Sequence, residues 1–192
     1  MNDLFVNTTV KKNRVFEFSP HIWLMTILLI YALFFFLKVT QKDWIFTGDT
    51  LNSFGQYCYN YFGYARGEYP LWNPLVRGGQ PSLLFNVFLT ANPVINLVAI
   101  FSVLSGVEDV ILSFSISIFL LLLFYVTGVY LLVSCWLDNK YAGVLAAILA
   151  LGSSSVFYQF YHNSFLLLLH HIPWILYAVT MYFKTFKFRY LI

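Results

Sequence analysis

Three long segments of this chain contain no charged side chain, and this feature limits its fold more than any other. They cover residues 83–107, 110–137 and 141–183, in a sequence that is 60% hydrophobic and 10% charged. A soluble domain carries about 25% charged residues, and uncharged apolar runs of about 18 residues or more are typical of membrane-spanning helices. The sequence therefore predicts an all-α, polytopic integral membrane protein.

A further apolar run, residues 22–39, lies near the N-terminus and indicates the direction of the chain. Lys11, Lys12 and Arg14 precede it, and basic residues concentrate on the cytoplasmic side of membrane proteins. We therefore expect a multi-pass protein of the plasma (cytoplasmic) membrane with its N-terminus in the cytoplasm. The net charge of +3 is small, and the basic residues flank apolar runs, so a nucleic-acid partner is not expected.

The segment 83–106 can be placed in two ways. If it crosses the membrane, the basic residues Lys184 and Lys187 lie outside, against the usual charge distribution. If it lies at the outer interface, those residues lie inside, and Asn92 and Pro93 in its middle avoid the hydrocarbon core. We expect the second arrangement.

The resulting organisation is a single membrane module, residues 1–192, with four spans and one long outer loop. The predicted spans are 22–39, 110–136, 141–158 and 165–183, and the predicted outer loop is 40–109. Pro173 lies within the fourth span and is expected to kink it. The outer loop and the turn around His162 then face the same side of the membrane.

Asp49 follows the first span and is the candidate catalytic residue. A carboxylate close to the bilayer surface can act as a general base or bind a divalent cation, which is therefore a candidate cofactor. The alternative is a solvated turn, because glycine followed by aspartate is a common turn pair. Asp43 is the nearest other carboxylate, and its position beside Lys42 is typical of a solvated charge.

The segment 67–81, "GEYPLWNPLVRGGQP", is the densest run of proline, glycine and aromatic residues in the chain. Arg77 beside two glycines can contact a phosphate, because a guanidinium and nearby backbone N–H groups can converge on one anion. The alternative is a lid whose aromatic rings only anchor the loop at the interface. The candidate residues for binding the donor phosphate or the substrate are Arg77, Trp72, Asn73, Gln80 and His162.

His170 and His171 lie within the fourth predicted span, where ionisable side chains usually face the bundle interior. One interpretation is a functional polar stripe. The other is a structural hydrogen bond from one imidazole to the carbonyl group that Pro173 leaves free. Together with His162 they match no familiar metal-binding spacing.

Gly48-Asp49 after the first span, "YPLWNPLVRGGQP" and "ANPVINLVAIF" together resemble the N-terminal part of YfhO-type bacterial membrane proteins. The resemblance covers about residues 22–185, and that family is similar to GT-C glycosyltransferases, which use polyprenyl-phosphate sugars. It implies interfacial helices in the outer loop, Asp49 as the catalytic carboxylate and Arg77 as a phosphate contact. The implied reaction transfers a sugar from a polyprenyl-phosphate donor to a cell-envelope acceptor on the outer face.

Members of that family carry more spans than the four predicted here, so we expect the N-terminal part of a longer protein, inactive alone. Two other functions stay open: a transporter or flippase component, and a non-enzymatic four-span membrane protein. Ion-coupled transport is less expected, because the predicted span centres hold serine, threonine and histidine but no acid, lysine or arginine.

Overall fold

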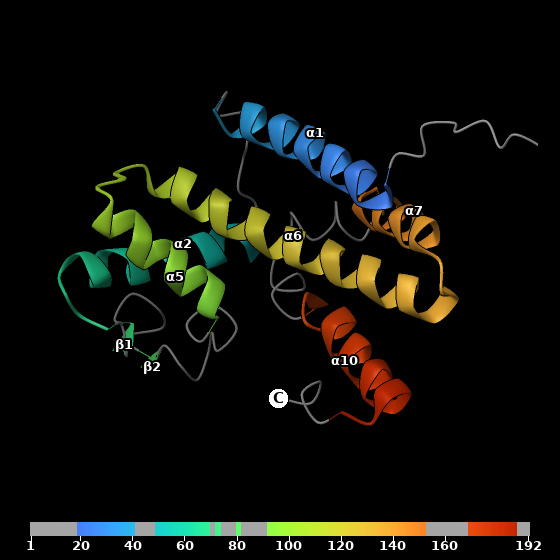
Figure 1. The fold of residues 1–192 in the computed structure, drawn as a ribbon. Coiled ribbons are helices and arrows are strands. Elements are labelled where there is room, and N and C mark those ends of the chain that lie inside the picture. Colours follow the sequence, from blue (N-terminus) through green and yellow to red (C-terminus); the bar gives the residue numbers. More distant parts are fainter. Residues whose placement is uncertain are drawn as a thin grey trace, which may run out of the picture.

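The computed structural model of the chain describes residues 19–40, 49–69, 72–73, 80–81, 92–152 and 169–187. Its helices are α1 (Pro20–Thr40), α2 (Asp49–Ala65), α5 (Pro93–Leu104), α6 (Val110–Leu137), α7 (Lys140–Leu151) and α10 (Ile172–Thr185). Two short strands, β1 (Trp72–Asn73) and β2 (Gln80–Pro81), pair in antiparallel orientation. Apart from this pair, the described residues confirm the predicted all-α class (Figure 1).

α6 is the central helix, and each of the other five contacts it. Its start is fixed by Asp109, whose carboxylate accepts a hydrogen bond from the backbone N–H of Leu112 at 3.0 Å. By length and composition it is the one helix of the described ranges that can cross a membrane. Its 28 residues rise about 42 Å. Shorter apolar helical stretches accompany it at Pro20–Leu33, Pro93–Leu104 and Lys140–Leu151.

α6 and α7 form an antiparallel hairpin in which the two helices approach closely at Gly143. Asn139 caps α7, because its side chain accepts hydrogen bonds from the backbone N–H groups of Tyr141 and Ala142. A Cβ atom at position 143 would lie 2.7 Å from the carbonyl oxygen of Tyr130. Real Cβ atoms essentially never come so close, so glycine is required at this crossing.

α10 lies along α6 and runs in the same direction. The indole N–H of Trp174 donates to the carbonyl oxygen of Phe124 at 2.8 Å, and the two rings stack with centroids 4.7 Å apart. Further along both helices, the indole N–H of Trp136 donates to the hydroxyl of Thr180 at 3.0 Å. Gly128 leaves room for the Trp174 ring, since a Cβ there would lie 2.8 Å from it.

Pro173, which was predicted to kink the fourth span, lies in the first turn of α10. That helix begins at Ile172, and His170 and His171 directly before it form a turn. Proline is favoured at that position, because the N–H groups of the first turn have no partner within the helix. Residues 153–158 of the predicted third span and 165–168 of the predicted fourth span lie outside the described residues.

α1 runs antiparallel to α6, as two contacts at its opposite ends demonstrate. Near its start, the imidazole Nδ1 of His21 lies 3.0 Å from the hydroxyl of Tyr130. Near its end, the ring of Phe36 meets that of Phe119, with centroids 5.3 Å apart. The end of α1 therefore points towards the start of α6 (Figure 1).

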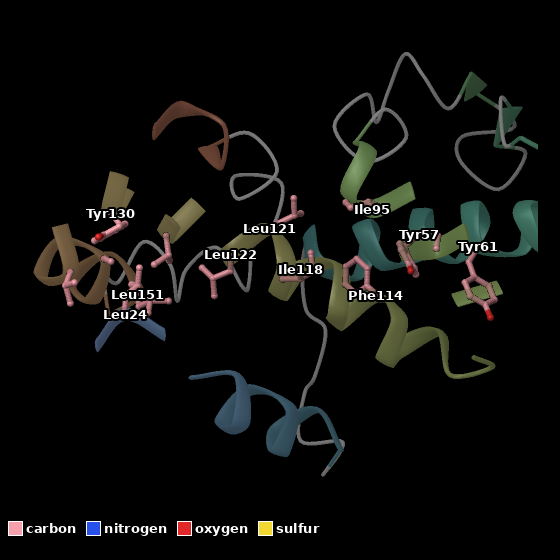
Figure 2. Packing of buried hydrophobic residues seen from close by; sticks show 14 residues of the cluster. Leu24, Tyr57, Tyr61, Ile95, Phe114, Ile118, Leu121, Leu122, Tyr130 and Leu151 are labelled. Carbon is pink, nitrogen blue, oxygen red and sulfur yellow. The ribbon is translucent and has the colours of Figure 1, made fainter. Parts of the chain in front are cut away.

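α2 and α5 pack at the N-terminal end of α6. Tyr57 and Tyr61 of α2 and Ile95 of α5 continue the buried apolar core that begins beside Leu24 and Tyr130 at the other end (Figure 2). Asn92 caps α5, because its side chain accepts hydrogen bonds from the backbone N–H groups of the first turn. The face of α5 that points away from the core exposes Leu97, Phe101 and Leu104.

Candidate functional site

α2 occupies part of the predicted outer loop, and it begins at the predicted catalytic residue, Asp49. Aspartate is favoured in the first turn of a helix, because its negative charge interacts well with the positive end of the helix dipole. The structure describes the backbone of Asp49, and its carboxylate lies outside the described residues.

Polar residues follow one face of α2 at intervals of four, three and four positions. They are Asp49, Ser53, Gln56 and Asn60. At about 100° per residue these positions lie within about 60° of one another around the helix. Ser53 is 4%, Gln56 5% and Asn60 0% exposed. We call these three side chains the α2 polar face, and the helical register places position 49 in line with them.

Sequence reasoning missed these three side chains, although one signal could have found them. Polar residues repeated every three or four positions predict a polar stripe on a helix. Residues 40–109 were interpreted as one outer loop, so the repeat that starts at Asp49 was not recognised as one face of a helix.

A chain of buried hydroxyl groups attaches α2 to α5 and α6. The Tyr57 hydroxyl lies 2.5 Å from that of Ser113, which donates to the hydroxyl of Ser102 at 2.6 Å. Because each hydroxyl has one proton and Ser113 gives its proton to Ser102, Tyr57 is the donor to Ser113. Burial raises the pKa of Tyr57, and hydrogen bonds with Ser113 and Ser117 partly oppose that shift. The phenol is therefore protonated at neutral pH.

Two more tyrosines of α2 hold its C-terminal half in place. The hydroxyl of Tyr61 donates to the carbonyl oxygen of Val107, in the turn between α5 and α6. The hydroxyl of Tyr64 donates to the side-chain oxygen of Asn96 at 3.0 Å. Burial, with a smaller contribution from Tyr69, raises the pKa of Tyr64 to about 12. These bonds leave the α2 polar face as a separate stripe beside the packed aromatic face.

Asn60 has a hydrogen-bond donor that no described group accepts. Its side-chain oxygen accepts a hydrogen bond from the amide of Gln56 at 3.2 Å. Its Nδ2 atom is buried and has no hydrogen-bond partner within the described residues. An unpaired buried donor costs about 1–3 kcal/mol. The Asn60 amide is therefore available to an acceptor atom that the described residues do not supply.

The structure describes the backbone of three candidate substrate-binding residues and no part of the other two. Strand pairing places the backbone of Asn73 opposite that of Gln80, with Trp72 beside them in β1. The side chains of these three residues, and the whole of Arg77 and His162, lie outside the described residues. The structure thus brings the two ends of the 72–81 segment together along the backbone.

His170 and His171 lie apart from α2. Their rings are 3.5 Å apart between centroids, and the buried ring of His170 meets the ring of Phe124 edge-on at 5.7 Å. Phe124 lies halfway along α6, whereas α2 packs at the first turns of that helix. Within the described ranges, no three His, Cys, Asp or Glu side chains come together as a group that could hold a metal ion.

Comparison with known proteins adds no relative from which a role could be transferred. No protein-family model matches the chain, and no curated protein or solved structure is significantly similar to it.

Proposed function

We propose that this chain is a plasma-membrane module of a GT-C-like glycosyltransferase. The enzyme of which it forms a part transfers a sugar from a polyprenyl-phosphate donor to a cell-envelope acceptor on the outer face, and Asp49 is the catalytic carboxylate. One observation carries the proposal. α2 begins at Asp49 and continues as a buried polar face at the same end of α6 towards which α1 runs.

The relative directions of the helices support the proposed topology. Consecutive spans cross a membrane in opposite directions, and α1 runs antiparallel to α6. A further span between them would make α1 and α6 parallel. This geometry favours an outer, non-spanning position for α5. Its 12 residues also rise only about 18 Å, against a hydrocarbon core of about 30 Å.

The surface of α5 also suits a position at the membrane. Leu97, Phe101 and Leu104 are exposed at spacings of four and three, which places them on one side of the helix. Contact with the outer leaflet would cover these apolar side chains. α2, with its tyrosines and amides, then lies on the water side of the module.

The catalytic proposal predicts that Asp49→Asn abolishes sugar transfer. The assay uses cells that lack the gene and are complemented with the wild-type or the variant gene. Their membranes are given polyprenyl-phosphate sugars that carry a ¹⁴C label, and the label that enters lipid-free polymer is counted. Asp43→Asn is the matched control, because it removes a carboxylate six positions earlier in the chain. Transfer by Asp49→Asn at the wild-type level would refute the assignment of Asp49.

The topology has its own test. In a chain with Cys58 and Cys135 replaced by serine, an impermeant thiol reagent added outside the cell should label Glu108→Cys. It should label Lys187→Cys only after the membrane is opened. Labelling of both positions from outside would mean that α5 crosses the membrane.

A second candidate function, translocation of a lipid-linked substrate, is favoured by one observation. His170 and His171 lie beside Phe124 in the middle of α6, and histidines at that depth commonly line a polar path. Proteoliposomes that move a fluorescent polyprenyl-phosphate lipid between leaflets, with equal rates for wild type and Asp49→Asn, would favour this function over sugar transfer.

A further inference from the structure

We propose that the α2 polar face binds a neutral, hydroxyl-rich group, a sugar ring, with the Asn60 amide as a hydrogen-bond donor to it. The assignment rests on the proposed function. It deepens that function, because it places the sugar of the substrate on α2 and the phosphate elsewhere.

The hydrogen bonds of the α2 polar face and its neighbours leave one buried donor without a described acceptor. Tyr57, Ser113 and Ser102 satisfy one another, and Gln56 donates to the Asn60 oxygen. The Nδ2 atom of Asn60 is left over in a fully buried side chain. Buried polar groups in folded proteins nearly always have a partner. A ligand oxygen at this point would supply the missing acceptor.

The charge of α2 favours a neutral ligand over a phosphate. α2 contains no lysine or arginine, and Asp49 is its only charged residue. The first basic residue after the helix, Arg66, is exposed and pairs with Glu68 at 3.6 Å. A phosphate on this face would meet no described cation. Phosphate sites depend on basic side chains or converging N–H groups, so the α2 polar face does not suit one.

The side chains of the α2 polar face have the chemistry that a sugar requires. Amide and hydroxyl groups both donate and accept hydrogen bonds, as sugar hydroxyls do. Ser53, Gln56 and Asn60 carry amide and hydroxyl groups along one line, and the helical register continues that line to position 49. A sugar on this face would lie in line with position 49, to which the proposed function assigns the catalytic carboxylate.

The α2 polar face is closed to solvent in this structure, and this sets an expectation for the binding rate. All three of its side chains are 5% exposed or less. Binding must therefore accompany an opening of the site, and association slower than about 10⁵ M⁻¹s⁻¹ is expected.

The test measures binding of neutral sugars to the whole chain in lipid nanodiscs. The probes are the methyl glycosides of glucose, galactose, mannose and N-acetylglucosamine, with inorganic phosphate for comparison. Saturation-transfer NMR titrations give their dissociation constants. Asn60→Leu removes the donor. Asn96→Leu is the matched control, because it removes a half-buried amide from α5 that already has Tyr64 as a partner.

We expect at least one glycoside to bind, Asn60→Leu to weaken it at least fivefold, and Asn96→Leu to change it less than twofold. If Asn60→Leu does not fold, Asn60→Thr, which keeps a donor, should weaken binding by about twofold to fivefold. The proposal is overturned if wild type binds no glycoside, which would leave only a buried water beside Asn60. Equal binding by all variants, equal losses in both leucine variants, or binding of phosphate at this face would also overturn it.

The two proposals fail in different ways. If glycoside binding depends on Asn60 and wild-type membranes transfer no sugar, the sugar site is supported and the proposed enzyme activity is contradicted. If sugar transfer depends on Asp49 and glycoside binding is unchanged by substitution of Asn60, the enzyme activity is supported and the sugar site on α2 is contradicted.

Discussion

Replacing Tyr57 by phenylalanine and Ser113 by alanine, singly and together, measures how firmly α2 is attached to α6. The two hydroxyls are 2.5 Å apart and both side chains are fully buried. Phenylalanine at position 57 keeps the ring contact with Phe114, whose centroid lies 5.2 Å away. The first substitution therefore removes the hydrogen bond and little of the packing.

The expected magnitudes follow from this geometry. Loss of one buried neutral hydrogen bond should lower the free energy of unfolding by about 1 kcal/mol in Tyr57→Phe. Ser113→Ala also removes the donor to Ser102 and leaves the Tyr57 hydroxyl without its closest acceptor, so about 2 kcal/mol is expected. The double variant should lose about as much as Ser113→Ala alone, which corresponds to a coupling energy of about 1 kcal/mol.

Unfolding in mixed micelles of dodecyl maltoside and SDS, followed by far-UV circular dichroism, gives these free energies. Tyr141→Phe is the control, because it makes the same chemical change at an exposed position of α7. The reasoning is refuted if the two single effects add, with a coupling energy below about 0.3 kcal/mol. α2 would then be attached by its aromatic rings alone.

Two further predictions concern packing and pH. Gly143→Ala should lower the free energy of unfolding by about 1–3 kcal/mol in the same assay, because the added Cβ would meet the Tyr130 carbonyl. Gly55→Ala, with nothing within 4 Å of the new atom, should raise it by up to about 1 kcal/mol; equal effects of the two would contradict the close crossing. The pKa of Tyr64 is raised from 10.0 to about 12, so its contribution to stability is complete below pH 10 and is lost as the pH rises towards 12. Unfolding free energies measured across that range should fall less steeply in Tyr64→Phe, and an unchanged slope would contradict the burial of this phenol.

The sequence predicted α6 well because polar residues mark both of its ends. Asp109 and Asp138 bracket an uncharged run, and the predicted span 110–136 forms the helix Val110–Leu137. The start of α10 was harder to predict, since apolar residues continue on both sides of it. The start of α10 is marked by Pro173 in its first turn, and hydropathy alone does not reveal that start.

The candidate site was only partly predictable for a different reason. Asp49 could be proposed from its place after the first span, but the residues in line with it depend on residues 49–65 being helical. The hydroxyl chain from Tyr57 to Ser113 joins positions 56 residues apart. Such a contact depends on how α2 crosses α6, and no local pattern in either segment specifies that crossing.

The antiparallel contact between α1 and α6 has a consequence for biosynthesis. His21 and Tyr130 are 109 residues apart in the chain. At a translation rate of about 5–20 residues per second, α1 waits roughly 5–20 s for its partner to be made. During that interval the face of α1 that later packs on α6 has no partner from that helix. In the membrane topology proposed above, α1 would then be held in the bilayer as a single helix before the module assembles around α6.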